Sequence, residues 1–259
     1  MSKTPTEIAL MAEAGRLLAS VFTYLDRLEL LGMSTLQVND LVDNYIVSEL
    51  KARPASKGQY GFAYSMNTSR NEVVCHGVPS ASEILCSGDL VNFDITLEKN
   101  GYIADSSKTY LIGEVSQQAR QLVQVTYEAM CKGIEAVRPG ARLGDIGHAI
   151  EQHARTHRYS VVREYCGHGI GREMHEPPEV LHWGKPGTGL TLREGMTFTI
   201  EPMLNQGTAD VRTLRDGWTV VTRDGQLSAQ FEHTVAVTGD GVRVLTLRPE
   251  ELQLSKISA

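Results

Sequence analysis

The chain has 259 residues and a formal net charge of −6, and its 41% hydrophobic and 22% charged residues are typical of a folded globular protein rather than a disordered one. This length suffices for one large domain with a well-buried core, and the acidic balance argues against DNA binding or any broad phosphate-binding surface. No apolar run approaches the ~20 residues that cross a bilayer, and no secretory signal follows the N-terminus, so we expect a cytoplasmic protein without a membrane segment.

Two helices are predicted at the start of the chain. Thr4 and Glu7 have the spacing of a capping box, with Pro5 at the first helical position, and apolar residues then recur at helical spacing. A second helix begins at Ser34, with Gln37 three residues later in the same capping pattern.

Extended segments follow these helices. Residues 53–70 are rich in Gly, Ser, Asn and aromatic residues, which indicates a loop with short strands. Residues 90–97 and 102–112 are two apolar runs joined through Asn100 and Gly101, the dipeptide most typical of a β-hairpin turn.

The second half of the chain repeats this order. Ser116 caps a predicted helix that runs through Val137, and another helix covers roughly 143–156. Strand-like segments then follow at 159–164, 196–203, 217–222 and 230–237.

A local self-match relates the two halves, because residues 88–94 and 195–201 each run from a glycine to a carboxylate six residues later. Coincidence between two half-buried strands would explain this match alone. A second carboxylate trails each one, Asp105 in the first half and Glu232 in the other, which favours an internal duplication. We therefore expect one α+β domain over residues 1–259, with half-repeats at about 5–112 and 116–238 around a central antiparallel sheet.

The hairpin turn predicts how two aspartates meet. If Asn100 and Gly101 are the central turn residues, Asp105 lies opposite Thr96, and Asp94 is its diagonal neighbour on the same face, ~7–8 Å away at the backbone. Either aspartate alone is explained more simply by facing solvent or capping a turn. Two buried like charges without a cation are costly, so for the pair we favour a metal ion.

Further potential metal ligands lie in the second half. Glu201 and Glu232 each interrupt an apolar strand, and His168 lies between glycines that permit close backbone approach. Four carboxylates and one imidazole favour Mn, Co, Fe or catalytic Zn over a structural zinc site. They suit two ions ~3.5–4 Å apart, which lower the pKa of a shared water, so hydrolysis is the expected chemistry.

Other histidines and the four cysteines lie outside this set of ligands. His76 and His175 could donate to a carbonyl oxygen or a tetrahedral intermediate. Four histidines are interpreted as solvent-facing or core-bonded: His148, His153, His157 and His182. The first three lie on or near a predicted helix without a set of carboxylates, and we assign them no role. The cysteines show no C-x-x-C spacing, which excludes a zinc ribbon and indicates reduced, mostly buried thiols: Cys75, Cys86, Cys131 and Cys166. The pair Glu250 and Glu251 is interpreted as a solvated tail.

Several motifs together resemble type I methionine aminopeptidases in their short bacterial form, from the first helix to about residue 240. They occupy residues 71–79, 91–96, 105–109, 167–171, 174–178, 198–202 and 230–234. The resemblance implies the pseudo-symmetric pita-bread fold. It also implies a cytoplasmic, monomeric metalloexopeptidase that removes the N-terminal methionine of nascent chains at the ribosome when the second residue is small.

The resemblance also implies a set of metal ligands, two divalent ions of Co, Mn, Fe or Zn being bound. Asp94 and Asp105 would hold one ion, Asp105 and Glu232 would bridge to the second, and His168 and Glu201 would complete it. Glu201 would also accept the proton of the attacking water.

The substrate contacts follow from the same resemblance. His76 and His175 would contact the substrate and its transition state, and Phe62, Met174 and Trp218 would form the apolar walls of the methionine pocket. A monovalent-cation site would use the backbones of Asn71 and Val73 together with Ser228.

The chain departs from the family in the region of this pocket. Ser56, Gln59 and Asn67 stand where bacterial members tend to have cysteine, tyrosine and cysteine, and a thioether prefers apolar, polarisable surroundings. Ala104 and Glu173 replace glycines common in the family. None of these positions belongs to the ligand set, so the departures bear on specificity rather than on chemistry.

Two alternatives remain open. An Xaa-Pro aminopeptidase or prolidase shares the fold, although such enzymes usually carry a substantial N-terminal domain. A non-catalytic relative that binds peptide or nucleic acid would use the fold alone. Such relatives typically lose metal ligands, whereas this sequence keeps all five.

Overall fold

The computed structural model describes residues 2–251 of the chain and shows an α+β protein, as predicted. The helices are α1 (Pro5–Leu25), α2 (Thr35–Asn44), α3 (Gln117–Glu135) and α4 (Leu143–Thr156), with short turns η1 (Tyr45–Glu49) and η2 (Gln59–Gly61). The strands are β1 (Arg53–Pro54), β2 (Met66–Arg70), β3 (Val73–Cys75), β4 (Leu90–Lys99), β5 (Tyr102–Leu111), β6 (Ser160–Val161), β7 (Gly167–Gly169), β8 (Glu176–Val180), β9 (Thr197–Ile200), β10 (Met203–Asn205), β11 (Val211–Thr213), β12 (Val220–Thr222), β13 (Ser228–Gln230), β14 (Glu232–Thr238) and β15 (Gly241–Val244).

The predicted helix starts are confirmed by their capping hydrogen bonds. At α1, the backbone N–H of Thr4 donates to Glu7 at 2.9 Å, and the N–H of Glu7 donates to the Thr4 hydroxyl at 3.3 Å. Ser34 and Gln37 form the same reciprocal pair at α2. At α3, the Ser116 hydroxyl accepts from the helix backbone. These local bonds satisfy N–H groups that a helix start leaves unpaired, which is why sequence alone locates them.

Helix α1 is apolar enough and long enough to match a membrane span, with a mean hydropathy of 1.4, whereas we expected no such segment. In the structure its apolar face packs on β4 and β5, and Leu18, Phe22 and Leu25 are fully buried. A hydrogen bond also joins α1 to the β4–β5 turn, since Glu13 accepts from the side-chain amide of Asn100 at 3.1 Å. The apolar composition of α1 is therefore used in the core.

The largest sheet has nine strands, all paired antiparallel, with the main path β1-β4-β5-β14-β9-β7-β8. The β4–β5 hairpin has the predicted register, in which Lys99 pairs with Tyr102 and Thr96 with Asp105. Asn100 and Gly101 both have positive φ, as the twist of a two-residue hairpin turn requires.

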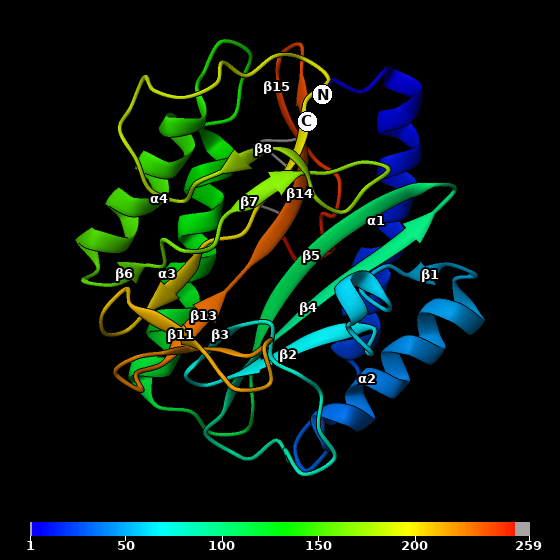
Figure 1. Ribbon diagram of the computed structural model, residues 1–259, viewed down its shortest axis with the longest axis vertical. Helices are drawn as coiled ribbons and strands as arrows, with labels where there is room; N and C mark the ends of the chain where they lie inside the picture. Colours follow the sequence, from blue (N-terminus) through cyan, green and yellow to red (C-terminus); the bar gives the residue numbers. More distant parts are fainter. Residues whose placement is uncertain (1, 252–259) are drawn as a thin grey trace.

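The two halves of the chain meet along β14. This strand pairs with β5 from the first half and with β9 from the second. Figure 1 shows β14 between α1 and α2 at the right and α3 and α4 at the left. Each half contributes two helices followed by strands. The interpretation of one domain built from half-repeats 5–112 and 116–238 stays a prediction.

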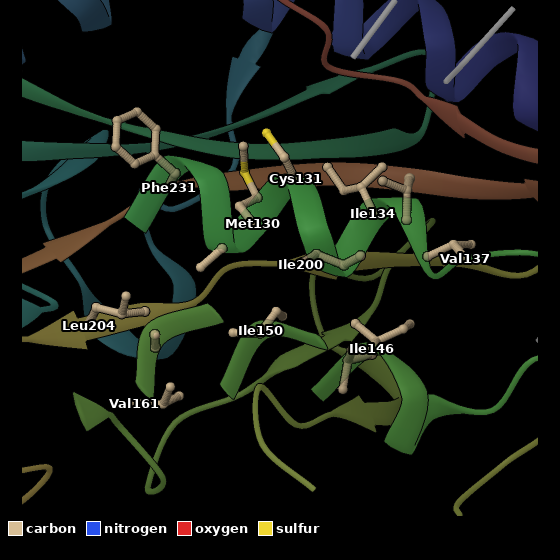
Figure 2. Close-up of a cluster of buried hydrophobic side chains, with 14 of the residues drawn as sticks. Met130, Cys131, Ile134, Val137, Ile146, Ile150, Val161, Ile200, Leu204 and Phe231 are labelled. Carbon is tan, nitrogen blue, oxygen red and sulfur yellow. The ribbon is translucent and has the colours of Figure 1, made fainter. Parts of the chain in front are cut away.

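Each helix pair covers its own hydrophobic core. In the second half, side chains from α3 and α4 meet those of the strands, as Figure 2 shows for Met130, Ile134, Ile150, Ile200 and Leu204. A separate cluster in the first half packs α1 and α2 against β4. Two three-stranded sheets, β13-β10-β6 and β11-β12-β3, lie beside the large sheet.

The predicted solvated tail at Glu250 and Glu251 is wrong for its second residue. Glu251 is buried, accepts a hydrogen bond from Arg248 at 2.6 Å and lies 3.1 Å from the His233 ring nitrogen. Burial opposes ionisation of Glu251, but His233 and Arg248 outweigh it and hold its pKa at about 2. The physical reason is that Arg248, itself buried over the ring of Phe22, needs an anion beside it.

We predict that Gly15→Ala destabilises the protein, because α1 passes close to the chain after β15. A Cβ at position 15 would lie 2.1 Å from the backbone carbonyl oxygen of Leu245. Because this oxygen belongs to the backbone, it cannot move aside as the end of a flexible side chain could. The expected loss is about 1–3 kcal/mol in the free energy of unfolding, measured by urea denaturation. Arg16→Ala, on the exposed side of the same helix turn, is the control, and an equal effect of both changes would contradict the packing account.

Candidate metal centre

Five neighbouring strands of the large sheet each bring one predicted ligand to a single pocket. In sheet order, Asp94 lies on β4, Asp105 on β5, Glu232 on β14, Glu201 just after β9, and His168 on β7. All five line one pocket of about 590 Å³. Residues that span more than half of the sequence are thus gathered by strand order alone.

The side chains approach within reach of a common ion. The His168 Nε2 atom lies 3.8 Å from Asp105 Oδ2 and 3.6 Å from Glu201 Oε1. Asp105, His168 and Glu232 each offer one ligand atom, and these atoms lie within 4.8 Å of one another. The sequence-predicted set is therefore brought together as a cluster.

Two buried carboxylate oxygens in this cluster have no partner. Among residues 2–251, nothing donates a hydrogen bond to Asp105 Oδ1 or to Glu232 Oε1, and both residues are at most 5% exposed. An unpaired buried polar atom costs free energy, and an unpaired charge costs more. A cation between these oxygens removes that cost, so the residues fit divalent metal ions.

The electrostatics of the metal-free cluster lead to the same conclusion. Burial raises the pKa of Asp94 to about 7 and that of Glu201 to about 8. Burial, and then the neighbouring carboxylates, raise the pKa values of Asp105 and Glu232 well above their usual range. His168 supplies no compensating charge, because burial and His175 lower its pKa to about 4. All four carboxylates can be ionised together here only if positive charge is added beside them. The four positive charges of two divalent ions would balance the four negative charges.

Neighbouring groups orient the ligands. The His168 Nδ1 atom lies 3.1 Å from the carbonyl oxygen of Gly169, which turns Nε2 toward the carboxylates. The Thr199 hydroxyl donates to Glu201 Oε1 at 2.7 Å, and Gln230 Nε2 lies 3.5 Å from Glu201 Oε2. Such outer partners fix the tautomer and rotamer of metal ligands.

The two other predicted histidines line the same pocket. The His175 ring lies 4.4 Å from the His168 ring, and His76 packs edge-on to Tyr165 at 5.3 Å. Burial lowers the pKa of His175, and burial followed by His175 lowers that of His76. Both imidazoles are therefore neutral at pH 7, and each can donate one N–H to a bound carbonyl oxygen.

The predicted apolar walls also lie at this pocket. The rings of Phe62 and Trp218 are 5.0 Å apart, and Met174 is buried beside them in the lining. Of the polar departures, Gln59 and Asn67 line the pocket as well. Ser56 also lines it, but its hydroxyl is hydrogen-bonded to Thr96 at 2.6 Å.

Sequence reasoning missed two residues at the centre. The backbone N–H of Glu201 donates to the Nε2 atom of buried His182 at 3.1 Å, so the core-bonded alternative for His182 is confirmed and this residue supports a ligand. Tyr60, 74% exposed, places its hydroxyl 3.4 Å from His175 Nδ1. In the sequence, only its place in the glycine-containing segment 56–62 indicates it.

One interpretation of the helical histidines is wrong. His153 does have a carboxylate beside it, since its Nε2 atom lies 3.1 Å from Glu128 on α3. The sequence could not show this contact, because it joins two helices. The four cysteines are free thiols: Cys75 and Cys131 are buried, Cys166 is partly buried and Cys86 is exposed.

The segments predicted to hold a monovalent cation lie side by side. The backbone N–H of Ser228 donates to the carbonyl oxygen of Asn71 at 2.9 Å, and the buried Ser228 hydroxyl has no hydrogen-bond partner among residues 2–251. Val73 belongs to β3, which pairs with β12. The cation itself stays a prediction.

We predict that the metal-free protein loses stability as pH rises from about 4 to about 8. The folded-state pKa values of Asp94 and Glu201, about 7 and about 8, exceed the ordinary values of 3.8 and 4.5, so the folded state holds more protons than the unfolded state in this window. This stability is fully present below the unfolded-state values and is lost progressively, by at most about 1.4 kcal/mol per pH unit for each carboxyl, until the pH passes the folded-state values. Urea denaturation in the presence of a chelator measures it. Asp94→Asn is expected to flatten the slope, and stability that rises with pH would contradict this electrostatic account.

Comparisons with known proteins point to a family of metallopeptidases. Residues 9–239 match the model of metallopeptidase family M24. A methionine aminopeptidase of Rickettsia prowazekii is 49% identical over 250 residues, 96% of each chain, and that of Escherichia coli K12 is 45% identical over 249 residues, 96% of this chain and 94% of the relative. The solved Rickettsia prowazekii enzyme superposes with a TM-score of 0.93, covering 95% of this chain and 99% of that one.

More distant structures share the fold alone. The prolidase of Pyrococcus horikoshii is 21% identical with a TM-score of 0.73, and the match covers 97% of this chain but 65% of the prolidase. The predicted pita-bread fold is thus confirmed. With the family model spanning nearly the whole chain and relatives close to half identical along their full length, the chain belongs to metallopeptidase family M24.

Proposed function

We propose that this chain is a metalloexopeptidase that removes the N-terminal methionine of nascent proteins whose second residue is small. The observation that carries the proposal is that five neighbouring strands bring five ligands to one pocket. Two carboxylate oxygens of these ligands are buried there without a hydrogen-bond partner among residues 2–251. The full-length similarity to proteins named methionine aminopeptidase supports the choice of substrate.

The five ligands divide between two divalent ions, of Co, Mn, Fe or Zn. Asp94 and Asp105 would hold one ion, His168 and Glu201 would hold the other, and Asp105 and Glu232 would be shared between the two. Ions bound in this way lower the pKa of water and polarise a peptide carbonyl.

Glu201 is the proton acceptor for the attacking water. Its Oε1 atom is fixed by the Thr199 hydroxyl at 2.7 Å, and its backbone is fixed by His182, so the carboxylate has one position at the pocket wall. A positioned carboxylate of this kind passes the proton on to the departing amine.

His76 and His175 act on the scissile peptide. Both are neutral, and each donates one N–H toward the carbonyl oxygen as negative charge develops there. Tyr60 lies against His175 and limits the rotation of that ring.

The methionine side chain occupies the region walled by Phe62, Met174 and Trp218. Beside it, Gln59 and Asn67 present polar groups to the thioether, so we propose weaker ground-state binding of methionine than in relatives with tyrosine and cysteine there. The second substrate residue lies against the ligand cluster, which leaves room for Ala, Ser or Gly.

The setting of this activity is proposed with it. The chain acts as one domain and as a monomer, on nascent chains at the ribosome in the cytoplasm, and a monovalent cation binds beside Asn71, Val73 and Ser228. Prolidase or Xaa-Pro aminopeptidase activity is one alternative, because prolidases share the fold. A non-catalytic role is the other alternative, and in it the five ligands would bind no metal.

Peptide hydrolysis tests this proposal directly. We expect metal-depleted protein to be inactive and to regain activity with Mn, Co, Fe or Zn on Met-Ala-Ser, and to leave Ala-Pro-Ala and Leu-Ala peptides uncleaved. Liberated amino acids are measured by chromatography. A preference for Ala-Pro-Ala would favour the prolidase alternative, and no cleavage under any metal would favour the non-catalytic one.

Two histidine variants separate ligand from catalytic donor. His168→Ala is expected to lose bound metal, whereas His175→Ala keeps its metal and loses about 100- to 1,000-fold in kcat, as removal of a transition-state hydrogen bond does in comparable sites. Metal content by atomic emission and kcat on Met-Ala-Ser are measured for both. Equal metal loss in the two variants would overturn the assigned roles.

A further inference from the structure

A second cluster of metal-ligating side chains lies between α3 and α4, away from the central pocket. Glu128 on α3, His153 on α4 and His157 at the end of α4 each offer one ligand atom, and these atoms lie within 4.8 Å of one another. None of the three lines the central pocket. The two histidines are four positions apart, which places them on one face of the helix.

Glu128 and His157 are each held by a further hydrogen bond, and His153 is held by Glu128 itself. Gln124 donates to Glu128 Oε1 at 2.9 Å, while Glu128 Oε2 lies 3.1 Å from His153 Nε2. The His157 Nδ1 atom lies 3.0 Å from the backbone carbonyl oxygen of His153. Because that oxygen can only accept, Nδ1 carries the proton and Nε2 keeps its lone pair for a metal.

The surroundings favour a cation from solvent. The cluster lies at the C-terminal end of α4, where the helix dipole is negative. The side chains of His153 and Glu128 are 17% and 41% exposed, so an ion can reach them. The two imidazole rings are 4.6 Å apart and inclined by 47°, which leaves them unstacked.

We propose that Glu128, His153 and His157 bind one zinc ion that joins α3 to α4. Two imidazoles and one carboxylate, with room for water as a fourth ligand, are a donor set that zinc accepts in tetrahedral geometry. These helices cover the core shown in Figure 2, so an ion held by both stabilises the packing of the second half of the chain. The proposal is independent of the function assigned to the central pocket.

Zinc counting tests this site on the metal-loaded enzyme. The Mn-loaded protein is equilibrated with zinc by dialysis, and zinc per chain is measured by atomic emission together with the thermal midpoint. Wild type and His148→Ala, a histidine change on the same helix, are expected to hold one zinc more than His157→Gln and Glu128→Gln. Zinc that exchanges into the central pocket is common to all four proteins and cancels in the comparison.

The thermal midpoint provides the second readout. Zinc is expected to raise it further in wild type and His148→Ala than in His157→Gln and Glu128→Gln. Equal zinc counts and equal thermal shifts in all four proteins would overturn the site. Cleavage of Met-Ala-Ser before zinc addition is expected to be equal in all four, so failure of the zinc site and failure of the proposed function are distinguishable.

Discussion

The structure depends on one electrostatic constraint, which is that four carboxylates are buried side by side in the middle of a sheet. Burial raises the pKa values of all four, repulsion from neighbouring carboxylates adds to the rise for Asp105, Glu201 and Glu232, and the nearest imidazole is neutral. Within the described residues, neither Asp105 Oδ1 nor Glu232 Oε1 has a hydrogen-bond partner. Divalent ions would supply the positive charge that these buried carboxylates lack, and without them the cluster is a cost that the packing of the helices and strands must offset.

The position of the centre follows from the way the halves join. Strand β14 pairs with β5 on one side and β9 on the other, so Glu232 stands between ligands of the first half and ligands of the second. Behind β14, Arg248 is buried with His233 and Glu251, and its positive charge partly opposes the rise in the pKa of Glu232. The end of the described chain thus closes the core behind the site.

Local chemistry was predictable from sequence, and contacts between elements were not. The turn at Asn100 and Gly101 fixed the hairpin register that brings Asp105 opposite Thr96, because only residues near the turn decide it. The convergence of His168 and Glu201 with that hairpin was inferred from the resemblance rather than from spacing. The burial of Glu251 cannot be predicted from sequence, because its partner Arg248 is itself buried against Phe22 of α1. The contact between Glu128 and His153 depends in the same way on the packing of two helices.

Electron paramagnetic resonance of the Mn-loaded protein tests the central claim that Asp105 and Glu232 bridge two ions. The account predicts two bound Mn ions per chain with an exchange-coupled signal, because shared carboxylates bring the ions to ~3.5–4 Å. Glu232→Gln is then expected to leave the signal of an isolated ion. A wild-type protein that holds two Mn ions with only isolated-ion signals, or one that binds a single ion at saturation, would contradict the account.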